Sequence, residues 1–237
     1  MNGAIYSKLE IDVMQVNEIQ EAVHLAIKHR LPAIVVHQTL SGDAIMARSR
    51  AGGKFKIITP VDWPKGEIFG DLKLRGLSFD SIETDGFEIL LTAGKSETDT
   101  RNEAKVLTEF LKSRIGDHVE VRFVLGTGSR SYDQVESICK SLSGVRTPAT
   151  IRTDTQLKAQ VTKANPDEHN KYIKMVTSHI NAPIKISGNL NNIKALTTCQ
   201  AASKYAVSLM QAKAIIKELQ SLPTNTEPAP DMNTDHT

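Results

Sequence analysis

Aromatic side chains are scarce in this sequence. Phenylalanine, tyrosine and tryptophan make up 5% of its 237 residues, and Trp63 is the one tryptophan. Proteins that hold single-stranded nucleic acid stack the bases on aromatic rings, so a surface of that kind is disfavoured. The formal net charge is +2 and the sequence pI is about 8.4, which falls short of a strongly basic nucleic-acid-binding domain. We therefore expect no nucleic-acid partner.

Cysteine is also rare, and the histidines are not clustered. The two cysteines, Cys139 and Cys199, lie in segments with a helical pattern and do not make a disulfide framework. This usage indicates a reducing, cytoplasmic setting. The seven histidines are dispersed along the chain, without the spacing of zinc ligands. We expect no metal site and no cofactor.

Long hydrophobic runs are missing as well. No apolar stretch approaches the roughly 20 residues of a membrane-spanning helix, and residues 1–5 lack the pattern of a signal peptide. Hydrophobic residues make up 40% of the chain and charged residues 24%, an ordinary balance for a globular protein. We expect a soluble cytoplasmic protein with no membrane partner.

Short apolar segments alternate with amphipathic helical patterns along the whole chain. Eight segments are predicted as strands: 5–14, 33–36, 55–58, 87–91, 119–125, 149–153, 183–187 and 205–208. A helix-like segment follows each of them, as at Ile19, Ala22 and Val23, where apolar residues recur with helical spacing. This alternation predicts a parallel sheet. Eight units in fewer than about 250 residues predict an α/β fold of the (β/α)8 TIM-barrel class.

The pattern predicts one barrel domain over residues 1–221. Residues 222–237 are polar and rich in proline, a composition typical of a disordered tail. No GxGxxG or GxxxxGK[ST] phosphate loop follows the first strand, which counts against the nucleotide-binding folds.

Several predicted strands carry one charged residue among apolar neighbours. Glu88, Arg152 and Lys185 occupy such positions, in the segments Phe-Glu-Ile, Ile-Arg-Thr and Ile-Lys-Ile. Strand side chains alternate between two faces, so we expect these three charges to share the barrel interior. The alternative is that they are solvated residues of edge strands. Asp62 and Arg122, within or just after predicted strands, are further site candidates.

A lysine in such an interior has a chemical use. Burial and a neighbouring cation both lower the pKa of a lysine, and a neutral amine can attack a carbonyl and form a Schiff base. In this interpretation Lys185 is the nucleophile, Arg152 supplies the perturbing charge and Glu88 moves protons. The alternative is a Glu–Arg–Lys salt-bridge cluster with no turnover.

The ends of the last two predicted strands suggest a phosphate site. Ser187, Gly188 and Asn189 precede a predicted helix start near Asn191 or Asn192, where backbone N–H groups can bind an anion. Ser208, at the end of the eighth strand, adds a hydroxyl, and the loops after strands seven and eight hold phosphate in many TIM barrels. Small residues at these positions are also ordinary turn residues.

The strand ends resemble those of the deoxyribose-phosphate aldolase family, class I aldolases with a TIM-barrel fold. Residues 57–66 are similar to the family's third strand and its Asn-Phe-Pro-x-Gly turn. Residues 121–128 resemble its Lys-Val-Ile-x-Glu-Thr-Gly strand, with Arg122 in place of the lysine. The resemblance puts Glu88 at the position of the family's catalytic aspartate and Lys185 at that of its second catalytic lysine.

The chain departs from the family on the sixth strand. The family has Lys-Thr-Ser-Thr-Gly there, and its lysine forms the Schiff base, whereas this chain has Arg152 at that position. Arginine cannot be deprotonated in a protein and cannot form the adduct. Asn189 and the residues around Ser208 also depart from the family's glycine-containing phosphate motifs.

The resemblance leaves three functions open. The first is a carbon–carbon lyase that acts on a small sugar phosphate or aldehyde with Lys185 as the amine. The second is a catalytically inactive homologue with a binding or structural role. The third is another barrel enzyme, such as an isomerase, that uses Glu88 as a base. Self-association into a homo-oligomer is compatible with each of them.

Overall fold

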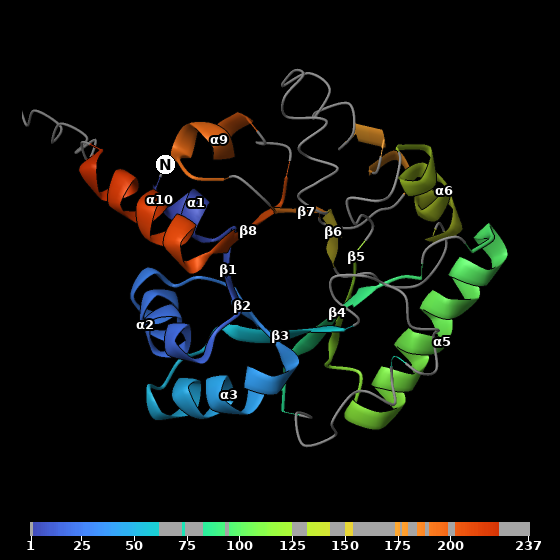
Figure 1. Cartoon of the computed structure of the whole chain (residues 1–237), viewed down its shortest axis with the longest axis horizontal. Coiled ribbons are helices and arrows are strands. Elements are labelled where there is room, and N and C mark those ends of the chain that lie inside the picture. The colour runs from blue at the N-terminus through green and yellow to red at the C-terminus, as the bar shows by residue number, and fades with distance from the viewer. Residues whose placement is uncertain are drawn as a thin grey trace, which may run out of the picture.

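Eight parallel strands close into a barrel in chain order (Figure 1). The computed structural model describes residues 2–61, 73, 83–92, 95–124, 132–142, 150–153, 174–175, 177–179, 184–187, 190–198 and 202–222. The strands are β1 (Leu9–Val13), β2 (Ala33–Val36), β3 (Lys56–Val61), β4 (Gly86–Leu90), β5 (Glu120–Val124), β6 (Thr150–Thr153), β7 (Ile184–Ser187) and β8 (Lys204–Ser208). Because β8 also pairs with β1, the sheet has no edge strand. The predicted (β/α)8 TIM barrel is confirmed.

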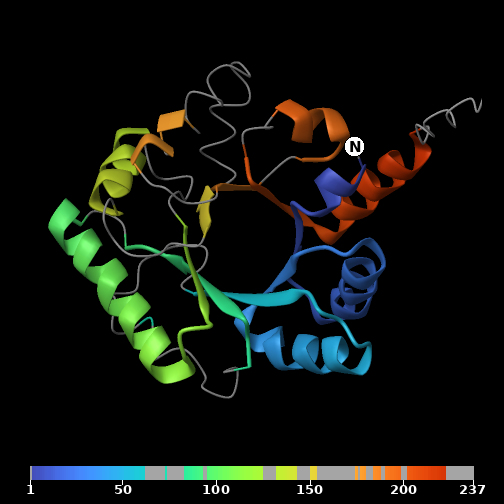
Figure 2. The same ribbon diagram turned by 180° about the vertical axis from the view of Figure 1, so that it is seen from behind.

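Helices surround the ring of strands on its outer side, as both views show (Figure 2). The described α-helices are α1 (Asn2–Tyr6), α2 (Ile19–His29), α3 (Ser41–Arg50), α5 (Glu97–Ile115), α6 (Tyr132–Leu142), α9 (Ile193–Thr198) and α10 (Leu209–Ser221). Short 3-10 helices lie at Val16–Glu18 and Gln38–Leu40. Side-chain caps fix two of the starts: Ser96 accepts a hydrogen bond from the amide of Asp99, and Ser208 accepts one from the amide of Gln211.

The predicted start of the first strand is wrong. Residues 2–6 form α1, and β1 begins only at Leu9. The amide of Ser7 donates to the carbonyl of Gly3 at 3.1 Å, so the backbone turns instead of extending. Ile5 and Tyr6 then pack against the core from outside the barrel. Their apolar character reflects this helix. The remainder of the first predicted strand overlaps β1, and the other seven predicted strands also overlap observed ones.

Side chains of the described strands alternate between an outer apolar layer and the barrel interior. The outer layer, between sheet and helices, includes Leu9, Ile11 and Val13 of β1, Phe87 and Ile89 of β4, Val121 and Phe123 of β5, and Ile184 and Ile186 of β7. The alternate positions face inward. Ala33, Val35 and Ile58 form a separate apolar cluster there, and buried charged residues of β1, β4, β5 and β7 occupy other interior positions.

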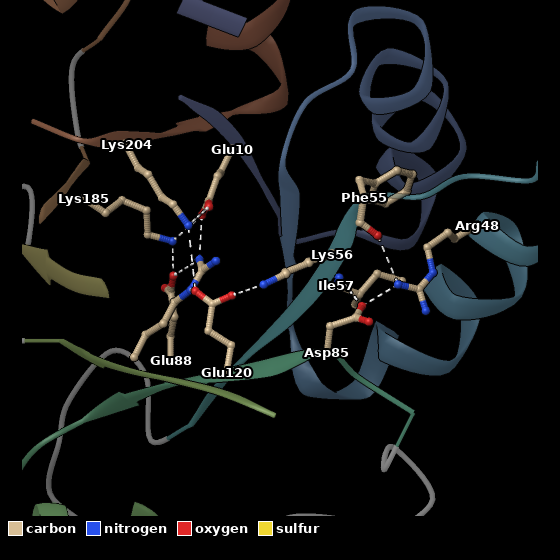
Figure 3. Close-up of polar contacts among 11 residues, drawn as sticks. Glu10, Arg48, Phe55, Lys56, Ile57, Asp85, Glu88, Glu120, Lys185 and Lys204 are labelled. Carbon is tan, nitrogen blue, oxygen red and sulfur yellow. Dashed lines mark hydrogen bonds and ion pairs between the residues drawn. The ribbon is translucent and has the colours of Figure 1, made fainter. Parts of the chain in front are cut away.

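A polar contact fastens α3 to the amino ends of β3 and β4 (Figure 3). The Asp85 carboxylate accepts a hydrogen bond from the amide of Ile57 at 2.7 Å and pairs with Arg48. Arg48 Nη1 also donates to the carbonyl of Phe55 at 3.1 Å. These bonds hold the two strands in the register that places Glu88 inside the barrel.

Some predictions concern residues outside the described part. The tail predicted at 222–237 lies there apart from Leu222. In the part of the chain that the structure describes, every helix is too short or too polar to cross a membrane.

Gly86 of β4 lies so close to β5 that an added methyl group would collide. A Cβ atom at Gly86 would lie 2.5 Å from the carbonyl oxygen of Glu120. We expect Gly86→Ala to lower the free energy of unfolding by about 1–3 kcal/mol, measured by urea titration. The matched control is Gly42→Ala in α3, where an added Cβ meets nothing within 4 Å and should be neutral or stabilising by up to about 1 kcal/mol. Equal stability of the two variants would contradict this strand spacing.

Candidate active site

Four charged side chains from β1, β4, β5 and β7 meet inside the barrel (Figure 3). Arg122 Nη1 lies 2.7 Å from Glu10 Oε2 and 3.2 Å from Glu88 Oε1. Lys185 Nζ lies 2.8 Å from the same Glu10 oxygen and also pairs with Glu88 Oε1. The four groups therefore form a closed ring in which carboxylates and cations alternate. We call Glu10, Glu88, Arg122 and Lys185 the interior ring; each is at most 1% exposed.

The strand register explains why these side chains meet. Glu88 and Arg122 are Cα partners on β4 and β5, so they enter the interior at the same height. Glu10 lies between two alanines, Ala33 of β2 and Ala206 of β8. Because these neighbours are small, the long side chains from β4, β5 and β7 have room to reach across to Glu10.

Three further charged residues continue the ring toward the amino ends of the strands. Lys56, Glu120 and Lys204 are the first residues of β3, β5 and β8. Glu120 accepts from Arg122 Nε at 2.8 Å and pairs with Lys56 at 2.7 Å. Lys204 Nζ lies 3.2 Å from Glu10 Oε1. The Lys56 side chain is 55% exposed and that of Lys204 is 22% exposed, so a chain of ionic contacts joins the buried ring to solvent.

The contacts favour the charged forms of the carboxylates in this network. Burial alone would raise the pKa of Glu10, but Lys185, Arg122 and Lys204 outweigh it and hold that pKa well below its ordinary value. Burial also opposes ionisation of Glu120, and its pKa is nevertheless lowered to about 2, chiefly by Arg122. The two carboxylates in turn raise the pKa of Arg122 against the effect of its own burial.

The structure brings together only some of the predicted site residues. Glu88, Lys185 and Arg122 all belong to the interior ring. Arg152 lies in β6 as the Cα partner of Lys185, but its side chain lies outside the described part of the structure. Asp62, Gly188 and Asn189 also lie outside the described residues.

The two predicted phosphate-site serines have different surroundings. Ser187 is buried at the end of β7, 2% exposed. Ser208 is exposed and accepts the amide hydrogen bond of Gln211 as the cap of α10. The hydroxyl hydrogen of Ser208 is not used in that bond.

Sequence reasoning missed Glu10, Glu120 and Lys204. Glu10 stands in the segment Leu-Glu-Ile and Glu120 in Val-Glu-Val, the same pattern of one charge between apolar residues that identified Glu88. Applying that pattern to every predicted strand would have found both carboxylates. Lys204 follows a serine at the start of β8, and no pattern marks it.

A second buried carboxylate fixes the chain that follows β4. Glu103 of α5 accepts hydrogen bonds from the hydroxyl of Thr92 at 2.7 Å and from its amide at 3.1 Å, and lies 3.0 Å from Lys73 Nζ. Burial would raise the pKa of Glu103, but Lys73 and Thr92 lower it. These contacts link α5 to Thr92, which follows β4, and to Lys73.

Comparison with known proteins supports the fold. No protein-family model and no curated protein matches the sequence. The tetrameric deoxyribose phosphate aldolase from Aeropyrum pernix matches with a TM-score of 0.75 and 13% identity over 94% of both chains. A Coccidioides immitis protein, provisionally described as a deoxyribose-phosphate aldolase, matches with a TM-score of 0.73 and 12% identity over 93% of this chain and 87% of its own. QR15, an aldolase, matches with a TM-score of 0.70 and 12% identity over 91% and 96%.

These identities establish a likeness of fold. The chain has an aldolase-like TIM barrel, and the resemblance to deoxyribose-phosphate aldolases seen in the strand ends is confirmed at the level of the whole structure.

The lowered carboxylate pKa values make the fold sensitive to acid. A carboxylate with a depressed folded pKa stabilises the protein above its unfolded pKa, near 4.5, and this contribution is lost as the pH falls toward the folded value, about 2 for Glu120. We expect the free energy of unfolding, measured by urea titration, to decline between these two pH values. Glu120→Gln cannot titrate and should show a shallower decline. If the free energy of unfolding declined equally steeply with falling pH in the wild type and in Glu120→Gln, the ion pairs assigned to Glu120 would be contradicted.

Proposed function

We propose that this chain is a carbon–carbon lyase of the aldolase type, acting on a small aldehyde or sugar phosphate with Lys185 as the amine. The observation that supports it is the direct contact between Lys185 Nζ and Glu88 Oε1 inside the barrel. An amine becomes a nucleophile only after it loses a proton, and Glu88 is placed to accept that proton. The pair is fully buried, with neither side chain more than 1% exposed.

The reaction then follows from these two groups. The neutral Lys185 amine adds to the carbonyl carbon, and the carbonyl oxygen leaves as water after protonation, with Glu88 as the acid. The resulting protonated imine draws electrons from the bond between the α and β carbons of the substrate. That bond breaks as a carboxylate of the interior ring removes the proton of the substrate's hydroxyl group, which becomes the carbonyl of the departing aldehyde. Cleavage leaves an enamine, whose α carbon takes a proton from the ring carboxyl group that has just been protonated. Water then adds to the resulting protonated imine, which releases the second product and regenerates the amine.

The remaining predicted residues take supporting roles in this proposal. Arg122 contacts both ring carboxylates and keeps them aligned on Lys185. Arg152 occupies the strand position where the resemblance puts the family's Schiff-base lysine, so the proposal moves the amine to the neighbouring strand. Ser187, Gly188, Asn189 and Ser208 stay our candidates for binding a substrate phosphate. A homo-oligomer is part of the proposal, because the Aeropyrum pernix protein is tetrameric.

A second function is favoured by the closure of the interior ring. Both cations contact the same two oxygens, and none of the four side chains is more than 1% exposed. A buried network of this kind can serve to specify the fold and nothing else. In that case the chain is an aldolase-like barrel without turnover, which binds a ligand or has a structural role.

Borohydride trapping separates these two functions. We expect reduction in the presence of a small aldehyde or a 2-deoxy sugar phosphate to leave a covalent adduct on the peptide that contains Lys185, detected by mass spectrometry. Lys185→Met should abolish the adduct. The control variant Lys213→Met should retain it, because Lys213 pairs with Glu21 on the outside of the barrel.

Absence of an adduct on the wild-type protein, or an adduct that survives Lys185→Met, would reject the lyase and favour the inactive barrel. Arg152→Lys, which restores the lysine of the resembled family, would then be the variant to trap in the same assay.

A further inference from the structure

The Glu10 carboxylate joins two cations that differ in their access to water (Figure 3). Its Oε2 atom lies 2.8 Å from Lys185 Nζ, and its Oε1 atom lies 3.2 Å from Lys204 Nζ. The Lys185 side chain is 0% exposed, whereas that of Lys204 is 22% exposed. Glu10 Oε2 therefore accepts a hydrogen bond from the buried amine. Oε1 forms an ion pair with a solvent-accessible amine and has no hydrogen-bond partner in the described part of the structure, so it is open to accept a proton.

We propose that Glu10 and Lys204 carry protons between Lys185 and water at the amino end of the barrel. The inference rests on the proposed lyase function, because each turnover requires Lys185 to lose and regain a proton. Substrates of TIM barrels enter at the carboxyl ends of the strands. A proton route at the opposite end would let Lys185 exchange protons while a substrate occupies the entrance.

The transfer changes only N–H and O–H bonds. For inward transfer, the Lys204 ammonium gives a proton to Glu10 Oε1, and the Lys204 amine takes a proton from water. Glu10, now a carboxylic acid, turns its carboxyl group about the Cγ–Cδ bond until the protonated oxygen faces Lys185, and then gives the proton to the neutral Lys185 amine. Outward transfer runs through the same steps in reverse, so the relay ends with each group as it began.

The contacts favour Lys204 over the other cation beside Glu10. Arg122 lies 2.7 Å from Glu10 Oε2, but a guanidinium does not release its proton in a protein. Lys56 is more exposed than Lys204, yet its ion pair is with Glu120, which meets the ring at Arg122. Lys204 combines direct contact with a ring carboxylate, a proton that can leave, and access to solvent.

The test measures proton exchange at Lys185 in the substrate-free protein. With ¹⁵N-labelled lysine, NMR gives the rate at which the Nζ protons of Lys185 exchange with water, and the signal is identified by its loss in Lys185→Met. Lys204→Arg keeps the positive charge and the ion pair but removes a proton that can leave. We expect this variant to slow the exchange on the order of a hundredfold, the scale of a positioned proton-transfer group.

Two controls distinguish a relay from a structural effect. Lys213→Arg makes the same substitution at the exposed Lys213–Glu21 pair and should leave exchange at Lys185 unchanged. The backbone amides of Ile184 and Ile186, on either side of Lys185, should exchange equally fast in wild type and Lys204→Arg. The relay would be overturned if the Lys185 Nζ protons exchanged at the wild-type rate in Lys204→Arg. It would also be overturned if the amides of Ile184 and Ile186 slowed as much as the Lys185 Nζ protons in that variant. Because no substrate is present, this outcome is independent of borohydride trapping.

Discussion

The barrel depends on mutual neutralisation of charges in its interior. Two carboxylates and two cations lie there with no more than 1% exposure, and any one of them alone would make a costly buried charge. The alternating order, in which each bridging oxygen contacts both cations, makes burial tolerable for all four. Because the members come from β1, β4, β5 and β7, the ring also joins β1 to strands on the far side of the barrel that do not pair with it.

The interior ring is compatible with both a catalytic and a structural role. Its enclosure places an amine against a carboxylate in a dry site, which is what acid–base and Schiff-base chemistry require. Its closure pairs each charge with opposite charges and would suit a structural network, although Glu10 Oε1 and Arg122 Nη2 have no hydrogen-bond partner in the described part of the structure. The lyase and the structural network differ in whether a proton can leave Lys185. The proposed route through Glu10 and Lys204 to the amino end of the barrel avoids Arg122.

The fold was predictable because period-two strands and helical patterns recur eight times, and a parallel sheet of eight such units can close on itself. Glu88 and Lys185 were predictable because a lone charge in an apolar strand must face the interior. Glu10 shows the same signal and could have been included. Two features lay beyond the sequence. Ile5 and Tyr6 have the pattern of a strand but belong to a helix. The contact between Arg122 and Glu10 depends on Ala33 and Ala206, which flank Glu10 on both sides only when the barrel is closed.

The most direct test of the interior ring is a double-mutant cycle between Glu10 and Lys185, measured as the free energy of unfolding. Lys185→Met alone should cost about 3–5 kcal/mol, because it unbalances a buried network, whereas Lys213→Met at an exposed pair should cost less than about 1 kcal/mol. The account predicts that Glu10→Gln with Lys185→Met costs at least about 1 kcal/mol less than the sum of the single changes. Additive costs would mean that Glu10 and Lys185 do not interact, and would contradict the ring.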